Sequence, residues 1–206
     1  MSTSNTKRIN VKKLVETAVL IAIVLVMGNT ILGTIQTPLL SVSLVTIPVA
    51  VAAIVVGPIG GLCCGMAFGI NSFIRAVMGL GGMTTVLFGI NPVGMFVTAV
   101  IMRCLVGYLV GIIFRALKEK THLSKISYYI GALCAPLLNT LLFMTSLCLF
   151  FYNTEYIQGL AIGKGATNPF MFVILLVGIQ GVIEAITGTI IGGSVALVLD
   201  KISKNS

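Results

Sequence analysis

The stretch PFMFVILLVGIQGVIEAITGTIIGGSVALVL, residues 169–199, decides the fold, because Glu184 is the one charged residue in an otherwise apolar run. A helix needs about 20 mostly apolar residues to cross the hydrocarbon core of a bilayer, and this run exceeds that length. Further apolar runs occupy residues 14–32, 44–56, 58–78, 92–116 and 126–152. The sequence therefore predicts an all-α membrane protein with six transmembrane helices in a single domain, residues 1–206.

The composition of the whole chain supports this prediction. Hydrophobic residues make up 57% of the chain and charged residues 9%, whereas a soluble globular domain carries about 25% charged residues. Soluble enzymes and nucleic-acid-binding domains are therefore excluded. The expected surrounding is the lipid bilayer.

The positive charges indicate the orientation of the predicted helices. The 13 Lys and Arg residues are concentrated in the tail 1–13, which includes Lys7 and Arg8, around the link between the fourth and fifth spans, and in the tail 200–206. Basic loops and tails stay on the cytoplasmic side of a membrane. We therefore expect both termini to be cytoplasmic, with an even number of spans, and no nucleic acid as a partner.

Ionisable side chains inside a span are costly, so each one indicates a partner, a cavity or an aqueous edge. Arg103 and Glu184 lie roughly 16 and 22 Å below Pro92 and Pro169, at about 1.5 Å per helical residue. Arg103 therefore falls at about mid-membrane, and Glu184 lies deeper in its span. We interpret them as a structural ion pair between the fourth and sixth spans, and contact with a ligand is the alternative.

A candidate binding site lies at the outer ends of the predicted spans. Arg75 has no acidic residue nearby in the sequence, and Asn71 lies one turn deeper on the same helical face. Either an anionic ligand or the lipid headgroups would suit the Arg75 guanidinium. The pairs Asn91-Pro92 and Asn168-Pro169 open the fourth and sixth spans, whose N-termini favour an anion such as a carboxylate.

N-capping alone explains both of these asparagines, so neither of them requires a ligand. Gln180 lies one turn above Glu184. Asn139, near the middle of the fifth span, contacts either a ligand or a neighbouring helix. The candidate substrate-binding residues are therefore Arg75, Asn71, Asn91, Gln180 and Asn139.

Small residues recur at every fourth position of several spans. Such stripes let helix backbones approach closely in lipid, so we expect them to pack inside the bundle. They are Gly57, Gly61, Gly65 and Gly69, then Gly107 and Gly111, then Gly188 and Gly192. Ala18 and Ala22 repeat the spacing in the first span, where either internal packing or a protein partner would use it.

Four segments form an ordered pattern: LVETAVLIA (14–22), LVTIPVAVAAIVVGPIGG (44–61), GMAFGINSFIR (65–75) and RCLVG (103–107). Together they resemble the substrate-binding S component of energy-coupling factor (ECF) vitamin transporters. The resemblance implies six helices with both termini inside, in a bacterial cell membrane. It also implies capture of a vitamin or similar micronutrient at the outer face, and no cofactor.

The resemblance further implies partners. Ala18 and Ala22 would dock on a transmembrane coupling protein (EcfT type), and two cytoplasmic ATPases (EcfA type) would supply the energy. The absence of a GxxxxGK[ST] phosphate loop from the chain agrees with ATP hydrolysis in other subunits. The loops 33–43 and 79–90 would close over the substrate. Pantothenate is the first candidate, because the residues suit an aliphatic anion and this sub-pattern includes pantothenate-type members; a pyridine-type vitamin is the next.

Two functions of other classes remain as alternatives. A stand-alone proton-coupled carrier would need an exchangeable carboxylate near the midplane, and Glu184 would serve. An intramembrane enzyme would need a buried base or metal ligands, yet the only histidine, His122, falls in a predicted cytoplasmic loop. Solute uptake by the isolated chain would favour the carrier, and turnover of a lipid or peptide by the isolated chain would favour the enzyme.

Overall fold

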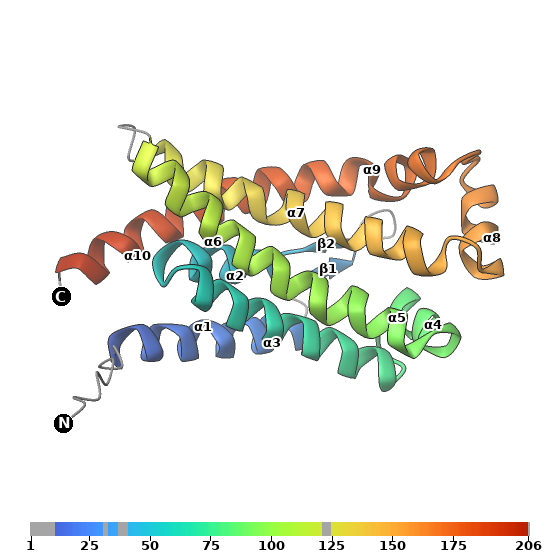
Figure 1. The fold of residues 1–206 in the computed structure, drawn as a ribbon, viewed down its shortest axis with the longest axis horizontal. Coiled ribbons are helices and arrows are strands. Elements are labelled where there is room, and N and C mark those ends of the chain that lie inside the picture. Colours follow the sequence, from blue (N-terminus) through green and yellow to red (C-terminus); the bar gives the residue numbers. More distant parts are fainter. Residues whose placement is uncertain (1–10, 31–32, 37–40, 121–124, 206) are drawn as a thin grey trace, which may run out of the picture.

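The computed structural model describes residues 11–30, 33–36, 41–120 and 125–205, and helices dominate it (Figure 1). The predicted cytoplasmic charges Lys7 and Arg8, the histidine His122 and residues 37–40 of the first predicted lid loop lie outside the described residues.

The chain starts with α1 (Val11–Asn29), an antiparallel pair of strands, β1 (Thr34–Gln36) and β2 (Ser41–Ser43), and the short helix α2 (Thr46–Val55). Then come α3 (Pro58–Val77), α4 (Met83–Ile90), α5 (Pro92–Phe96), the π-helical turn η1 (Val97–Ile101) and α6 (Met102–Lys120). The rest consists of α7 (Ile126–Phe151), α8 (Glu155–Gly163), α9 (Pro169–Thr187), a second π-helical turn η2 (Gly188–Gly192) and α10 (Gly193–Asn205).

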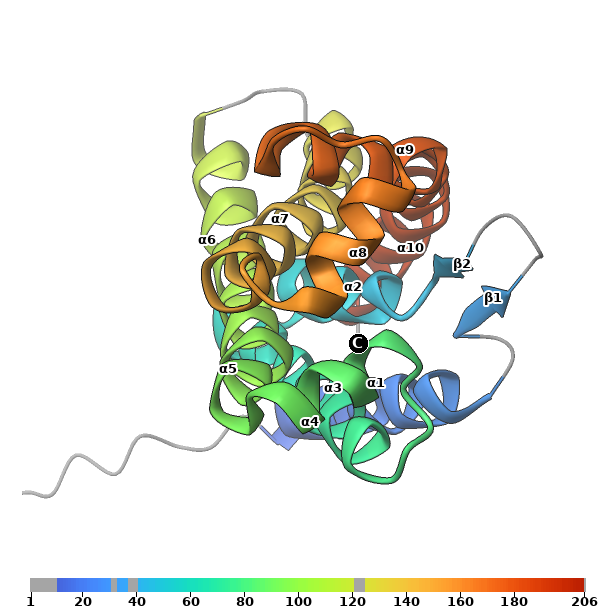
Figure 2. The ribbon, with the colours of Figure 1, turned by 90° about the vertical axis from the view of Figure 1, so that its right-hand side faces the viewer.

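The helices form an elongated bundle with two distinct ends. α1 begins and α10 ends at the same end, which we call the terminal end, whereas α4 and α8 lie at the opposite, loop end (Figure 1). The hairpin of β1 and β2 lies on one flank of the bundle (Figure 2), and β2 contacts α9.

The structure supports the predicted all-α membrane fold. Among the described residues, four helices are long and apolar enough to cross a membrane: Pro58–Val77, Pro92–Glu119, Ile126–Phe151 and Pro169–Ser203. The predicted first span overlaps α1, which begins three residues earlier and carries Lys12, Lys13 and Glu16 near its start. The predicted second span contains α2, which has only 10 residues. Six crossings therefore stay a prediction.

The structure also contains elements that the sequence did not predict. The segment 79–90, expected to be a flexible glycine-rich loop, is helical over α4, and its glycines make the preceding turn, with φ of +79° at Gly79 and +60° at Gly82. Thr154 is the N-cap of α8, and its hydroxyl accepts a hydrogen bond from the Ile157 amide, the arrangement that favours a helix N-terminus. Both helices cap the loop end of the bundle.

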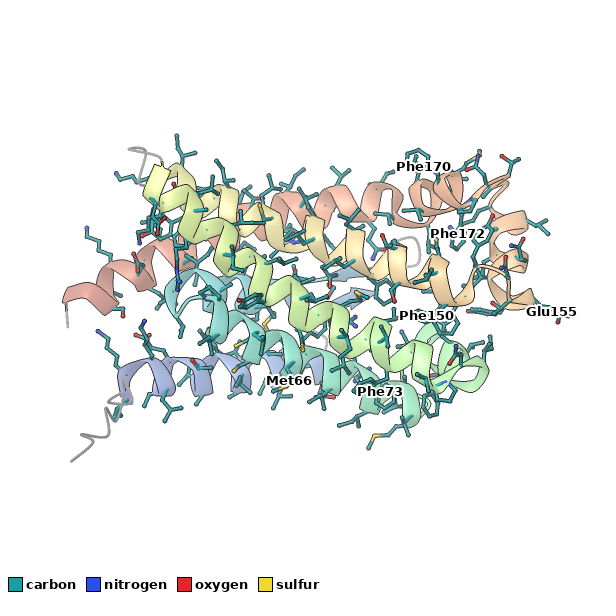
Figure 3. All side chains as sticks on the ribbon, in the orientation of Figure 1. Met66, Phe73, Phe150, Glu155, Phe170 and Phe172 are labelled. Atoms are coloured by element: carbon teal, nitrogen blue, oxygen red, sulfur yellow. The ribbon has the colours of Figure 1, made fainter. Side chains whose placement is uncertain are left out.

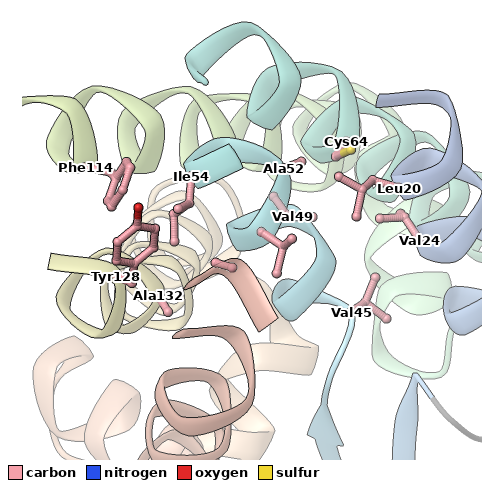
Figure 4. Close-up of a cluster of buried hydrophobic side chains, with 12 residues drawn as sticks. Leu20, Val24, Val45, Val49, Ala52, Ile54, Cys64, Phe114, Tyr128 and Ala132 are labelled. Carbon is pink, nitrogen blue, oxygen red and sulfur yellow. The ribbon is translucent and has the colours of Figure 1, made fainter. Parts of the chain in front are cut away.

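α2 is short because protein rather than lipid surrounds it. Eight of its 10 residues are buried. Side chains from α1, α3, α6, α7 and α10 meet those of α2 in one hydrophobic cluster, which includes Val49, Ile54 and Tyr128 (Figure 4). A helix that is covered on all sides can be apolar throughout without reaching across the bilayer.

The glycine stripes pack inside the bundle, as predicted. A Cβ added to Gly61 would overlap the carbonyl of Gly107, and one added to Gly65 would overlap the carbonyl of Arg103, so α3 and α6 touch backbone to backbone. Gly57 does not belong to the stripe. It lies in the turn between α2 and α3, where its backbone has a φ of +110°.

A polar cluster joins three helices at the terminal end. The Lys118 ammonium lies 3.2 Å from the Asp200 carboxylate and donates a hydrogen bond to the Tyr128 hydroxyl at 3.3 Å. The Tyr128 hydroxyl in turn donates to Asp200. The cluster ties α6, α7 and α10 together where the chain leaves the apolar bundle.

Candidate functional site

A cavity of about 280 Å³ lies among α6, α7 and α9, and we call it the polar cavity. Phe68 of α3, Ser43 at the end of β2 and Met83 at the start of α4 complete its wall. It is lined by Ser43, Phe68, Met83, Arg103, Asn139, Thr140, Phe143, Met144, Leu176, Val177, Gln180, Gly181 and Glu184. A cation, an anion and two amides therefore face one small space.

Arg103 is held in this wall by its own helix and by two aromatic rings. Its Nη1 donates a hydrogen bond to the Ala99 carbonyl at 3.0 Å. The guanidinium carbon lies 4.4 Å from the centre of the Phe68 ring and 5.4 Å from that of Phe143, within cation–π range. The Arg103 Nε is buried and has no hydrogen-bond partner. Because a buried donor without an acceptor is costly, this nitrogen favours an acceptor brought by a ligand.

Glu184 lies opposite and is 7% exposed. Its Oε1 accepts hydrogen bonds from the Ser43 amide at 2.7 Å and from Gln180 Nε2 at 3.4 Å. One carboxylate thus connects the end of β2 to α9. A carboxylate has about four lone-pair positions that accept hydrogen bonds, so Glu184 can also accept a hydrogen bond from a ligand.

The direct ion pair that we predicted between Arg103 and Glu184 is not formed. In the part of the chain that the structure describes, the one salt bridge joins Lys118 and Asp200. Arg103 is compensated by a carbonyl and two ring faces, and Glu184 by an amide and Gln180. Both charged residues instead line the polar cavity.

Two π-helical turns adjoin these charges. η1 ends two residues before Arg103, and η2 begins four residues after Glu184. A π turn adds a residue to the helical repeat and rotates the side chains that follow it, and such turns are frequent at functional sites. No residue pattern in the apolar runs predicted either turn, or the contributions of Phe68, Phe143, Ser43 and Met83.

Of the predicted substrate-binding residues, Gln180 and Asn139 line the polar cavity, but Arg75, Asn71 and Asn91 do not. Asn71 accepts a hydrogen bond from Asn29 Nδ2 at 2.8 Å, and Arg75 donates to Asn29 Oδ1 at 3.5 Å and to the Leu80 carbonyl at 3.4 Å.

The Asn91 side chain accepts from the Gly94 amide at 2.9 Å, and the Asn168 side chain accepts from the Met171 amide at 2.8 Å. The capping interpretation of these two asparagines is therefore confirmed. Ala18 and Ala22 lie one turn apart on α1, and both are exposed. Their exposure leaves this face of α1 available to a partner.

Fold and site together define an α-helical membrane protein with a small, mixed-polarity cavity between its helices. Over residues 12–192, the sequence matches the family described as ECF transporter, substrate-specific component. The chain belongs to this family, whose members are substrate-binding subunits of ECF importers rather than enzymes. No curated protein matches the chain as a relative.

Proposed function

We propose that this protein captures a water-soluble vitamin at the outer face of a bacterial cell membrane and holds it in the polar cavity. Delivery then proceeds through a transmembrane coupling protein of the EcfT type, powered by two cytoplasmic ATPases of the EcfA type. The observation that carries the proposal is the polar cavity, which is lined by Arg103, Asn139, Gln180 and Glu184, with the buried Nε of Arg103 left without a partner.

The chemistry of the polar cavity favours a carboxylate that also carries hydrogen-bond donors. Arg103 suits the carboxylate, Glu184 accepts from a hydroxyl or amide, and Asn139 and Gln180 both donate and accept. Pantothenate has a carboxylate, an amide and two hydroxyl groups, and is our first candidate. A volume of about 280 Å³ is close to the lower limit of about 300 Å³ for ligand pockets, which suits a solute of this size. A pyridine-type vitamin, stacked against Phe68 or Phe143, is the second candidate.

We further propose six crossings with both termini cytoplasmic. The common position of the start of α1 and the end of α10 supports an even number, and Lys12, Lys13 and Lys201 supply positive charge at that end. The loop end then faces outward. The exposed Ala18 and Ala22 are the proposed docking face for the coupling protein.

Binding and transport tests separate this function from its alternatives. The purified chain, offered a mixture of vitamins, should retain one of them in native mass spectrometry. Uptake into proteoliposomes should require the coupling protein, both ATPases and ATP. Uptake by the chain alone, driven by a proton gradient and lost in Glu184→Gln, would instead establish the stand-alone carrier.

A further inference from the structure

A second and larger hollow lies between α7 and α9, and we call it the α7–α9 groove. It has a volume of about 960 Å³ and is lined from Leu133 to Cys148 on α7 and from Pro169 to Ile190 on α9 and η2. None of its lining residues is charged. Its lipid-facing edges are exposed: Leu141 is 61% and Phe170 76% accessible, and Phe170 lies on α9 towards the loop end (Figure 3).

Small residues and a kink create this groove. Gly178 has φ of +43° inside α9, and a Cβ added there would meet nothing within 4 Å. Gly181 and Ala185 continue the same wall with little or no side chain. The Thr189 hydroxyl donates its hydrogen to the Ala185 carbonyl at 2.5 Å. Apart from Thr140, Thr145 and Thr189, the side chains of the wall are apolar, so the groove offers contacts mainly to hydrocarbon.

The position of the groove indicates what surrounds it. Only 11% of the most apolar part of Pro169–Ser203 and 22% of that of Ile126–Phe151 is buried, compared with 39% in Pro58–Val77. These two helices thus present most of their apolar surface outward, which in a membrane protein meets lipid. An empty apolar groove would forfeit dispersion contacts along its whole length.

The dimensions of the groove admit an extended chain but not a helix. From Leu133 to Cys148 the α7 wall is roughly 22 Å long at about 1.5 Å per residue, while one leaflet of the hydrocarbon core is about 15 Å deep. The volume of about 960 Å³ over that length gives a cross-section on the order of 40 Å². A helix with its side chains, about 10 Å across, needs about twice that area.

We propose that the α7–α9 groove binds an acyl chain of a membrane phospholipid. Thr140, Met144, Val177 and Gly181 line both the groove and the polar cavity, so the bound chain supports the outer side of the wall that the solute touches from the inside. The lipid site itself does not depend on the proposed vitamin.

The test is photo-crosslinking in nanodiscs that contain a phospholipid with a diazirine in its acyl chain. Crosslinks mapped by peptide mass spectrometry should concentrate on the groove walls, at least fivefold above the exposed faces of α1 and α3. The double variant Thr145→Phe/Ala185→Phe, which fills the groove from both walls, should reduce the groove crosslinks at least fivefold. Leu149→Phe/Ile179→Phe is the matched control, because both residues are exposed on the same helices but line neither hollow.

An even spread of crosslinks over α1, α3, α7 and α9 in the wild type would overturn the proposal whether or not the variants fold. Groove crosslinks that persist in the Thr145→Phe/Ala185→Phe variant would also overturn the proposal. None of these results depends on solute binding, so the proposed function is tested separately.

Discussion

Replacement of Arg103 by Met tests whether the polar cavity recognises an anion. The side chain keeps its apolar stem and much of its volume, but loses the cation and the unpartnered Nε. Hydrogen bonds to charged groups contribute about 1.5–3 kcal/mol, and each 1.4 kcal/mol is about tenfold in affinity. The solute retained by the wild type should therefore bind about 10- to 150-fold more weakly, as measured by isothermal titration calorimetry in nanodiscs.

Two further variants separate recognition from folding. Arg103→Lys keeps the charge but loses the planar fork, so its affinity should fall between those of the wild type and Arg103→Met. Arg75→Ala removes a cation that lies outside the polar cavity and should leave affinity unchanged. Thermal unfolding of each variant checks the fold. An Arg103→Met protein that unfolds like the wild type and binds the solute within twofold of it would refute the role of Arg103.

Three other changes test the architecture through thermal unfolding. Gly61→Val drives a side chain into the Gly107 backbone, and should cost about 1–3 kcal/mol, as overpacking does. Asp200→Asn removes the charge beside Lys118; because the lysine is partly exposed, we expect about 1–3 kcal/mol, between the values for surface and buried pairs. Gly178→Ala places a side chain at φ of +43°, which should cost about 1–3 kcal/mol in backbone strain.

Each of these changes has a matched control in open surroundings. Gly89→Ala and Gly163→Ala add a methyl group to helical glycines where a Cβ meets nothing within 4 Å, so neither should destabilise the protein. Glu155→Gln removes a negative charge from the exposed start of α8 and should have a smaller effect than Asp200→Asn. A control that lowers stability as much as its partner would show that the assigned contact is not the cause.

The transmembrane helices were predictable because a helix that crosses a bilayer must be long enough and apolar enough to do so. The run 169–199 and its counterparts are long enough to identify helices without any tertiary information. α4 and α8 were missed because they are only 8 and 9 residues long and lie outside the apolar runs. For α2 the sequence was ambiguous, because an apolar run of this length is equally compatible with a transmembrane helix and with a helix buried in protein.

The site was predictable only in part, because sequence gives the depth of a residue but not its rotation about the bundle. Depth placed Arg103 and Glu184 beside the same cavity, but the inferred ion pair is absent, because Arg103 contacts the Ala99 carbonyl and Glu184 the Ser43 amide. Arg75 and Asn71 do share a helical face, yet that face meets Asn29 rather than the polar cavity. Phe68 and Phe143 carry no signal, since phenylalanine is common in spans.

The hydrogen bond from Ser43 to Glu184 connects the polar cavity to the hairpin. A solute that donates to Glu184 would use a carboxylate that the end of β2 already holds by a hydrogen bond, and Ser43 itself lines the cavity. The carboxylate has acceptor positions for both donors, so binding need not break the bond to the hairpin. If the bond to β2 holds the Glu184 carboxylate in place, it strengthens solute binding. By thermodynamic linkage, the bound solute then stabilises the position of β2 by the same free energy.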